Sequence, residues 1–320
     1  MTGSPEVTLA VVSWNTRELL GRCLDAVADE VAAGRVQAWV VDNASSDGSA
    51  ELVRSHYGWA HLCALEENLG FGRAVNLVAE RTTSPWLAIA NADAAPRPGA
   101  LDALLATGER DPRAGAIAPR LVLPDGSTQH SVFGFPTVPY AALLNSGLFH
   151  ASAALADRLA VPGHWDETRA RRVPWAVAAW LLVRRSAWDA VGGFEPRQWM
   201  YAEDLDLGWR LRRAGWATRY EPRAVVDHVS GASTSQAWGD DAPLQWWKST
   251  YGWMARRRGP ARTWAVAALN AGGAAARWAV LAPAERLAPE AWRPRRRALA
   301  HATRAHTGGL VPRRVLEGYR

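Results

Sequence analysis

The sequence predicts an α/β fold, in which helices flank a mostly parallel sheet and a basic helical extension follows. Short apolar, β-branched runs alternate with segments of helical spacing before residue 94. This is the pattern of strands joined by crossover helices. After about residue 235 the alternation stops, and aromatic and basic residues become frequent. We therefore expect a sheet domain over residues 1–235 and a separate helical extension over residues 236–320.

The first part of the chain carries the clearest elements. In a parallel sheet, ligands bind beyond the carboxyl ends of the strands, where this sequence places polar loops. Helices are indicated by apolar residues spaced three and four apart, and buried strands by short apolar runs. The predicted strands are Val7–Ser13 and residues 36–41, 61–65 and 86–90, and the predicted helices cover residues 16–28, Ser49–His56 and residues 73–80.

The second part has a different rhythm. Strands are predicted at residues 116–123, 129–135, 177–183 and 224–228, and helices at Arg185–Val191 and from the acidic cluster near residue 203 to Arg213. Residues 136–172 contain several Pro and Gly without a clear period, so we expect an irregular lid or acceptor loop there.

The charge is unevenly distributed. Residues 251–320 hold 14 Arg and three Glu, whereas residues 1–250 have a balance of −5. A nucleic-acid-binding protein should carry basic residues among its sheet motifs, so this distribution argues against one. The two cysteines, Cys23 and Cys63, lack disulfide or metal-ligand spacing and fit a reducing compartment.

Targeting signals are not evident in the sequence. Residues 1–6 lack a basic segment followed by an apolar one. The sequence also shows no run of about 18 strongly apolar residues, and its nearest candidate, residues 264–283, is interrupted by Asn270 and Arg277. We therefore expect a cytoplasmic protein.

Three loops at predicted strand ends are candidates for ligand binding. Asp42 and Asn43 could hold a ribose or a uracil-like base, although a capped loop without ligand explains them equally well. The glycine-rich turn at residues 68–72 opens a helix carrying Arg73, which suits a diphosphate. Asp93 could bind Mg²⁺ or Mn²⁺ between phosphates, although a strand-end Asp is also a common turn former. His228 ends a later strand in the same way, and a metal role or a packed histidine both fit it.

The acidic cluster Glu203, Asp204 and Asp206 is the most informative feature of the chain. Carboxylates at a helix start are favourable with the helix dipole, and this explains Asp206. Three acids exceed what a cap needs, and the lead-in Gln198-Trp-Met-Tyr201 is unusually aromatic for a surface turn. We interpret Asp204 as a general base, with Glu203 as the neighbour that raises its pKa or orients it.

These motifs, in their order, resemble family 2 glycosyltransferases with the GT-A fold. The resemblance covers roughly residues 7–255, and within the family it is closest to bacterial rhamnosyltransferases acting on N-acetylglucosaminyl-diphospho-polyprenol. The motifs are Val12-Ser-Trp-Asn15, Val41-Asp-Asn-Ala-Ser-Ser-Asp-Gly48, Asn68-Leu-Gly-Phe-Gly-Arg-Ala-Val-Asn76, Asn91-Ala-Asp93, Leu182-Val-Arg-Arg185, Gly192-Gly-Phe194, Met200-Tyr-Ala-Glu-Asp-Leu-Asp-Leu207, Arg213-Ala-Gly-Trp216 and Lys248-Ser-Thr-Tyr251.

The resemblance implies roles for individual residues. Residues 1–114 would form the nucleotide-sugar half and residues 115–235 the acceptor half. Asp204 and Glu203 would be catalytic, and Asp93 with His228 would hold Mg²⁺ or Mn²⁺. The implied acceptor contacts are Trp199, Met200 and Tyr201, and the implied donor contacts are Ser13, Asn15, Asp42, Asn43, Asn68, Gly70, Arg73, Asn76 and Asn91. Many members carry Asp-x-Asp at the metal site, whereas this chain has Asn91 in the first position.

The implied activity is inverting, metal-dependent transfer of a sugar to a polyprenyl-diphosphate-linked acceptor in cell-wall or surface-polysaccharide synthesis. The Asn-x-Asp form favours a deoxysugar donor, dTDP-rhamnose. The alternatives are a family member that uses a UDP-sugar and a secondary-metabolite glycosyltransferase. Arg256–Arg258, three Trp and residues 293–297 of the extension suit docking on the cytoplasmic face of an anionic membrane. A solvated tail that packs on the catalytic domain is the alternative, and a homodimer is left open.

Overall fold

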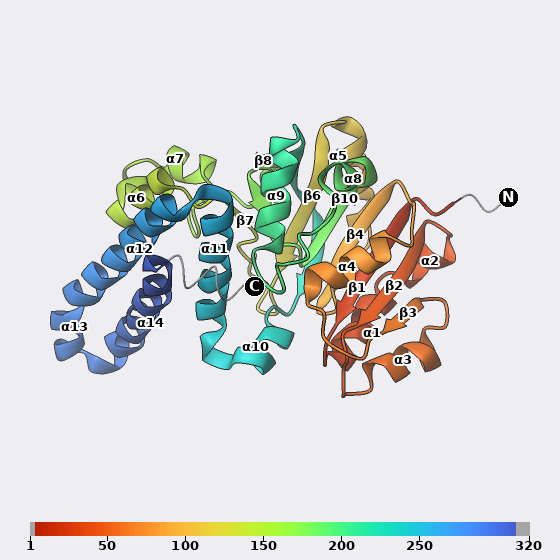
Figure 1. The fold of residues 1–320 in the computed structure, drawn as a ribbon, viewed down its shortest axis with the longest axis horizontal. Helices are drawn as coiled ribbons and strands as arrows, with labels where there is room; N and C mark the ends of the chain where they lie inside the picture. Colours follow the sequence, from red (N-terminus) through yellow and green to blue (C-terminus); the bar gives the residue numbers. More distant parts are fainter. Residues whose placement is uncertain (1–3, 312–320) are drawn as a thin grey trace. The chain divides into compact units, whose positions relative to one another are not determined.

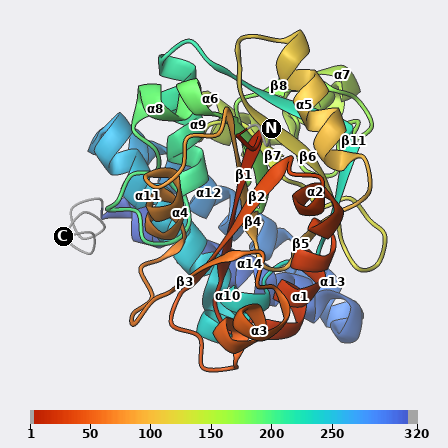
Figure 2. The ribbon, with the colours of Figure 1, turned by 90° about the vertical axis from the view of Figure 1, so that its right-hand side faces the viewer.

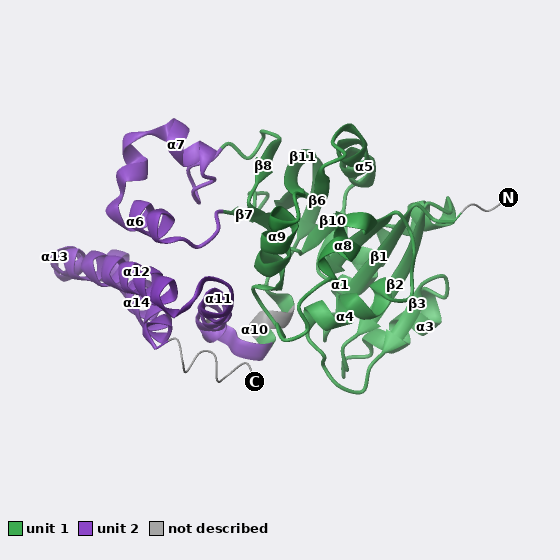
Figure 3. Cartoon of the chain, turned by 45° about the horizontal axis from the view of Figure 1, so that its top comes forward, with its two compact units in different colours: residues 1–133, 166–236 green, residues 134–165, 237–320 purple. Residues whose placement is uncertain are grey.

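The computed structural model describes residues 4–311, apart from the side chains of residues 233–235 and 240, so the last nine residues of the predicted extension lie outside the described part. The chain divides into two compact units (Figure 3). Unit 1 comprises Met1–Phe133 and Asp166–Gln236, and unit 2 comprises Gly134–Trp165 and Ala237–Arg320. Residues 134–165, which the sequence suggested as part of the acceptor half, therefore group with the C-terminal helices.

Unit 1 contains the sheet strands and the helices around them (Figure 1). Its strands are β1 (Val7–Ser13), β2 (Val36–Asp42), β3 (His61–Ala64), β4 (Trp86–Asn91), β5 (Ala94–Pro96), β6 (Ala114–Val122), β7 (Val132–Phe133), β8 (Arg171–Val173), β9 (Trp175–Ala176), β10 (Trp180–Arg184) and β11 (Ala217–His228). Its helices are α1 (Arg17–Asp25), α2 (Ala28–Ala32), α3 (Ser49–His56), α4 (Phe71–Ala79), α5 (Ala100–Arg110), α8 (Arg185–Val191) and α9 (Glu203–Arg213), and α10 (Ala232–Trp238) leads out of the unit.

The main sheet is mixed, with the order β3-β2-β1-β4-β10-β6-β11-β5 and with β8 paired to β11. Strands β1 to β4 run parallel, β10 is antiparallel to both neighbours, and β6 pairs parallel with β11. Helices cover both faces: α4, α8 and α9 lie on one side, and α1, α2 and α5 on the other (Figure 2). This arrangement confirms the predicted sheet flanked by helices, but the sheet is not mostly parallel, because four of its strand pairs are parallel and four are antiparallel.

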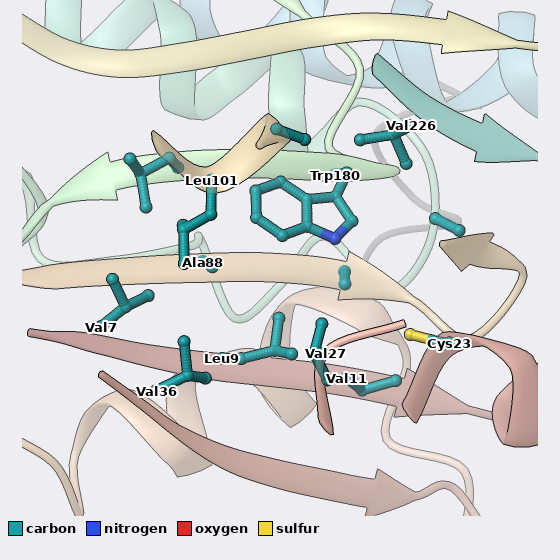
Figure 4. Close-up of a cluster of buried hydrophobic side chains, with 14 of the residues drawn as sticks. Val7, Leu9, Val11, Cys23, Val27, Val36, Ala88, Leu101, Trp180 and Val226 are labelled. Carbon is teal, nitrogen blue, oxygen red and sulfur yellow. The ribbon is translucent and has the colours of Figure 1, made fainter. Parts of the chain in front are cut away.

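The core lies between the sheet and the α1, α2 and α5 side (Figure 4). Val7, Leu9 and Val11 project from one face of β1, as alternate residues of a strand must. Trp180 from β10 fills the middle of this cluster, and Cys23 closes its end. Cys23 is fully buried, as expected for a cysteine that fills the core.

Several elements differ from the prediction. Helix α5 and strand β5 were not predicted, and the strand expected over residues 129–135 is reduced to the two residues of β7. Residues 136–172 are not irregular throughout, because they contain α6 (Val138–Ser146), the 3-10 turn η1 (Leu148–Ala151) and α7 (Ala153–Arg158). Helix α6 is apolar on all sides, so it lacks the period by which a helix is recognised in a sequence.

Unit 2 is helical. Besides α6, η1 and α7 it contains η2 (Gly239–Asp241), α11 (Ala242–Arg258), α12 (Pro260–Val280), α13 (Ala282–Leu287), α14 (Pro289–Thr307) and η3 (Gly308–Leu310). A buried polar chain joins its helices: Asn145 donates to Asn270, Asn270 donates to the hydroxyl of Tyr251, and this hydroxyl lies 2.8 Å from His306 Nδ1. Burial lowers the pKa of His306 to about 4, so a neutral imidazole can accept the Tyr251 proton.

One helical stretch of the described residues, Pro260–Leu287, is long and apolar enough to count as a candidate membrane span by length and composition, and 28% of its most apolar window is buried. This corrects the expectation that no such stretch exists. The criterion is weak evidence for a span, because a buried core helix also meets it. What the structure adds is that this stretch is largely uncovered within the described part of the chain.

Candidate functional site

The predicted donor residues meet at one edge of the sheet. Strand β1 lies between β2 and β4, and the parallel register places Ser13 beside Asp42 and Val12 beside Asn91. The loops that follow these three strands therefore open at the same place, as expected for parallel strands. The sheet brings together the ends that the sequence placed up to 78 positions apart.

The loops after β1 and β2 are held to each other. Asn15 has a positive φ of 51°. Its side-chain oxygen Oδ1 accepts a hydrogen bond from the Ser46 backbone amide at 2.8 Å, and its backbone amide donates to Ser45 Oγ at 2.9 Å. Asp42 is buried, and its Oδ2 accepts from the Ser45 amide at 3.1 Å. Asp42 Oδ1 is buried without a hydrogen-bond partner within the described structure. A buried carboxylate oxygen without a partner is costly, so it is a candidate acceptor for a base N–H or a ribose hydroxyl.

The glycine turn is tied to the segment before α9. Asn43 holds this turn through Leu69 and Gly70, and Asn68 Oδ1 accepts from the Gly70 amide at 2.9 Å. Gly70 has φ +80°, and a Cβ at this position would overlap the backbone carbonyl of Trp199. The Trp199 indole in turn donates to the Asn68 carbonyl at 3.2 Å. Only glycine allows this approach, so the predicted diphosphate turn and the predicted acceptor segment are in direct contact.

Two residues of α4 have different environments. Asn76 donates to the Phe194 carbonyl at 2.9 Å and accepts from the Phe194 amide at 3.0 Å. The side-chain amide of Asn76 therefore fastens the Gly192–Phe194 turn to α4. A contact of the same amide with the nucleotide-sugar donor, as predicted, would have to be made beside these two hydrogen bonds. Arg73 is exposed in the first turn of α4, and within residues 4–311 no ion pair to it is found. Its guanidinium is available for a phosphate.

Asp93 and His228 are brought together although they are 135 positions apart in the sequence. Strand β5 pairs antiparallel with β11, with Ala94 opposite His228, and this sets His228 Nε2 3.2 Å from Asp93 Oδ1. Both side chains are nearly buried, at 7% exposure for Asp93 and 4% for His228. His228 Nδ1 lies 2.6 Å from Gln129 Oε1, an oxygen that can only accept, so Nδ1 carries the proton. In a neutral imidazole of this tautomer, Nε2 presents its lone pair toward Asp93 Oδ1, as it would toward a metal ion held by the two residues.

This pair fits a divalent cation. Adjacent ligands of an octahedral ion with bonds of about 2.1 Å are roughly 3 Å apart, which matches the Asp93–His228 spacing. Imidazole nitrogen with a carboxylate suits Mn²⁺, and Mg²⁺ is commonly held by one or two carboxylates plus substrate phosphates. Among the described residues, no group of three or more His, Cys, Asp or Glu could hold a metal. A cation here would accordingly rely on donor oxygens for its remaining ligands.

The acidic cluster begins α9 after a strained turn. Tyr201 and Ala202 both have φ of 62°, a left-handed conformation that is unfavourable for residues with a side chain. Gln198 is completely buried, and its amide donates to the Tyr201 carbonyl, which holds the turn from beneath. The turn places Glu203 and Asp204 in the first turn of α9 with fixed backbone direction.

Asp204 is tied to the end of the sheet. Its Oδ1 accepts from the Leu205 amide at 2.7 Å, and its Oδ2 accepts weakly from the Ala178 amide at 3.4 Å. The next residue, Ala179, accepts from the Asn91 amide at 2.9 Å. Asp204 therefore lies beside the end of β4, and Asp93 follows Asn91 by two residues. One short segment before β10 connects the predicted base to the predicted metal site.

Burial shifts the protonation of the two acids. Removal from water raises the pKa of Asp204 to about 6, and backbone N–H donors, first among them those of Leu205 and Ala178, partly oppose this shift. Burial, together with the charge of Asp204, raises the pKa of Glu203 to about 8. Glu203 is therefore protonated near neutral pH while Asp204 is ionised, so the pair carries one negative charge. At pH 7 Asp204 is ionised, and its pKa lies only about one unit below the pH. A carboxylate with such a pKa is well matched to proton abstraction.

Asp206 is separate from this pair. It is almost completely buried, and its Oδ2 accepts a hydrogen bond at 2.6 Å from Nε of Arg210, which lies one turn further along α9. Arg210 also donates to the Val191 carbonyl, so the ion pair joins α9 to the end of α8. Asp206 lies in the first helical turn as predicted, and its main contact is this buried salt bridge.

Replacing Glu203 with Gln should change the pH dependence of stability. Because the pKa of Glu203 is raised above its ordinary value of 4.5, the folded state holds a proton that the unfolded state loses. The wild type should therefore lose stability as pH rises from about 4.5 to about 8. The melting temperature of Glu203→Gln should match the wild type near pH 5 and exceed it above pH 8. The exposed Glu290→Gln serves as control, and a melting difference that does not vary with pH would contradict the raised pKa.

The predicted acceptor residues line the approach to α9. Trp199 is 43% exposed, and Met200 and Tyr201 are half-buried. Sequence reasoning did not find Gln129, which orients His228, as a site residue, and it noted Gln198 only as part of the lead-in. Their polar character was visible in the sequence, but their partners were not, because Gln129 contacts a residue 99 positions away.

A mixed sheet of this order, with acidic and amide residues at its strand ends and helices on both faces, defines the GT-A fold of nucleotide-sugar-dependent glycosyltransferases. The family model described as glycosyl transferase family 2 matches residues 8–155. The N-acetylglucosaminyl-diphospho-decaprenol L-rhamnosyltransferase of Mycobacterium tuberculosis is 36% identical over 216 residues, which cover 63% of this chain and 69% of that protein. The chain belongs to glycosyltransferase family 2 and is a glycosyltransferase.

Two further proteins are similar to this chain. The pre-mycofactocin glycosyltransferase of M. tuberculosis is 35% identical over 191 residues, which cover 57% of this chain and 36% of that protein. The mannosyltransferase of Pyrobaculum calidifontis, solved in complex with GDP-Man and Mn²⁺, aligns with a TM-score of 0.60 at 19% identity. The alignment covers 99% of this chain and 88% of that one, and this likeness supports the fold.

Proposed function

We propose that this protein is an inverting, metal-dependent rhamnosyltransferase. It transfers L-rhamnose from dTDP-rhamnose to a hydroxyl of a polyprenyl-diphosphate-linked sugar in cell-wall or surface-polysaccharide synthesis. The observation that carries the chemistry is the partly buried carboxylate of Asp204 beside the strand end that leads to Asp93. The substrates are suggested by the 36% identical rhamnosyltransferase, whose acceptor is named as a decaprenol-linked sugar.

In this mechanism each residue has a separate task. Asp42 Oδ1 accepts a hydrogen bond from the base or ribose, and Arg73 contacts the diphosphate. Asp93 and His228 would hold Mg²⁺ or Mn²⁺, which when bound neutralises charge on the leaving nucleoside diphosphate. Asp204 accepts the proton of the acceptor hydroxyl as this hydroxyl attacks the anomeric carbon from the face opposite the diphosphate. Attack from that face inverts the anomeric configuration.

The lipid-linked acceptor also suggests where in the cell the protein acts. A polyprenyl-linked sugar lies at a membrane, so we place the protein in the cytoplasm, peripherally bound to the plasma membrane through its basic extension. A nucleic-acid partner is not proposed, and the oligomeric state is left open.

A donor screen tests the proposed substrate. Release of nucleoside diphosphate should be fastest with dTDP-rhamnose, in the presence of Mn²⁺ or Mg²⁺ and an N-acetylglucosaminyl-diphospho-prenol acceptor. UDP- and GDP-hexoses should be slower by at least about tenfold, since a pocket built around one sugar leaves polar groups unpaired with another. A preference for a UDP-sugar, or for a small metabolite acceptor like that suggested by the pre-mycofactocin enzyme, would favour the alternative family activity.

A further inference from the structure

The far end of the α12–α14 hairpin in unit 2 is left uncovered by the described chain. One stripe of α12 is buried, consisting of Thr263, Val266, Ala267, Asn270 and Ala274. Beyond Ala274 the helix has no covered face, because all six residues from 275 to 280 are exposed. Helix α13 follows directly and connects α12 to α14 at the tip of the hairpin (Figure 1). We call residues 275–297 the hairpin tip.

The tip is nevertheless an ordered structure. Arg296 of α14 has its guanidinium 4.1 Å from the Trp278 ring of α12 and donates to the Trp278 carbonyl at 3.1 Å. The same guanidinium pairs with Glu285 of α13, and Arg293 lies 3.6 Å from the other oxygen of that carboxylate. A single arginine thus joins all three helices. The tip presents a fixed surface because these contacts connect its three parts.

The surface of the tip is apolar at its end. Leu287 is 88% exposed and Val280 is 75% exposed, the two highest values among the exposed large hydrophobic residues. Trp278, two residues before Val280 on α12, is 42% exposed. Side chains of this kind gain free energy when they leave water, so a cluster of them at the end of a helical hairpin marks an interaction site.

The charge around these residues is positive. Residues 275–297 contain six Arg against two Glu, and one of these acids, Glu285, is already neutralised by Arg296 and Arg293. Arg286, Arg295 and Arg297 are exposed, and no acidic partner of theirs is found within residues 4–311. Exposed apolar side chains and exposed arginines on one short segment are complementary to a surface that offers negative head groups above an apolar layer.

We propose that the hairpin tip inserts into the interface of an anionic phospholipid membrane, with Val280 and Leu287 below the head groups and the exposed arginines among them. The insertion rests on the proposed function in one respect: a lipid-linked acceptor lies in the membrane that the tip would enter. A second copy of the chain would bring the same positive charge to the tip, so it is a less favourable occupant. The part of the basic extension that enters the membrane is then the hairpin tip, residues 275–297.

A site-directed fluorophore tests the insertion directly. Cys63→Ser leaves the fully buried Cys23 as the remaining cysteine. Leu287→Cys in that background is labelled with the environment-sensitive dye NBD. On addition of phosphatidylglycerol-containing vesicles the emission should shift to the blue and be quenched by brominated acyl chains. Pure phosphatidylcholine vesicles should give a shift several-fold smaller, because the arginines lack counter-charges. NBD at Trp59→Cys, on an exposed turn of unit 1, is the matched control and should not respond.

A second variant separates lipid binding from folding and from catalysis. Val280→Ser/Leu287→Ser should float with anionic vesicles at least about tenfold less than the wild type, since the two aliphatic side chains that would enter the apolar layer are removed. Because both positions are exposed, the melting temperature should stay unchanged. Turnover on a water-soluble short-chain acceptor should also stay unchanged, while turnover on an acceptor embedded in vesicles should fall.

The outcomes distinguish this proposal from the proposed function. An NBD signal that does not respond to vesicles, or one accompanied by a concentration-dependent dimer that the double Ser variant abolishes, would overturn the insertion. Vesicle insertion in a protein that releases no nucleoside diphosphate from any donor would support the insertion and refute the rhamnosyltransferase activity.

Discussion

Asp204→Asn is expected to lower kcat by two to four orders of magnitude, roughly the range over which a positioned general base contributes. Asn keeps the shape of the side chain but cannot accept a proton from the acceptor hydroxyl. Donor affinity should remain within about threefold of the wild type, because Asp204 is proposed to contact the acceptor and not the nucleotide. Calorimetric titration with donor and steady-state kinetics of nucleoside diphosphate release measure the two effects separately.

The pH profile gives a signature that a structural role of Asp204 would not produce. The base acts in its ionised form, so wild-type kcat should rise with pH through the pKa of about 6 and level off above it. The residual rate of Asp204→Asn should lack this rising limb. Because the Leu205 and Ala178 amides both donate to the carboxylate, the Asn amide group must face one of these donors, and a lower melting temperature is expected.

A matched surface variant controls for the loss of one negative charge. Asp102 is exposed and pairs with Arg35, an interaction of small energetic value at a protein surface. Asp102→Asn should leave kcat, donor affinity and the pH profile unchanged. Equal losses of donor affinity and turnover in Asp204→Asn would instead assign this residue a structural role.

The sequence was most informative about strands β1, β2 and β4 and the loops that follow them. Strands β1 and β4 are buried along nearly their whole length, β2 alternates between buried and half-buried residues in its first half, and each of the three strands ends in a polar residue. Local pattern and order along the chain were therefore sufficient to predict this edge of the sheet. The direction of a strand could not be predicted from its residues, because a buried apolar run such as β10 has the same pattern whether it pairs parallel or antiparallel.

The contacts that organise the site were less accessible. Asn76 belongs to a motif associated with the donor, yet its amide is paired with Phe194, 118 positions away. Gln129 and Gln198 each orient a functional residue through one long-range or turn-specific hydrogen bond. Such roles depend on tertiary pairing, which residue type and spacing do not encode. The acidic cluster was found as a group, but only the contacts in the structure separate Asp206, which pairs with Arg210, from the interacting Glu203–Asp204 pair.

Asp93→Ala is expected to remove most of the contribution of a divalent cation to donor binding. Within residues 4–311, Asp93 and His228 are the two candidate protein ligands at the ends of β4 and β11, so the variant keeps one of two. Asn91, which stands in place of a second acid, cannot supply the missing charge. We expect donor affinity in the presence of Mn²⁺ to fall by at least about tenfold, since changes to the ligand shells of metal sites commonly cost ten- to hundredfold.

Chelation provides the comparison that identifies the cause. EDTA should weaken donor binding to the wild type to about the level of Asp93→Ala, and it should change the variant little. Gln129→Leu should give a smaller loss, because it removes the hydrogen bond that fixes the His228 tautomer but leaves both ligands present. Asp227→Asn, beside His228 but exposed and paired with Arg97, should bind donor as the wild type does. If Asp93→Ala bound donor as tightly as the wild type, with or without EDTA, the Asp93–His228 pair would be a structural contact, and the charge on the leaving diphosphate would have to be balanced by Arg73 and its neighbours.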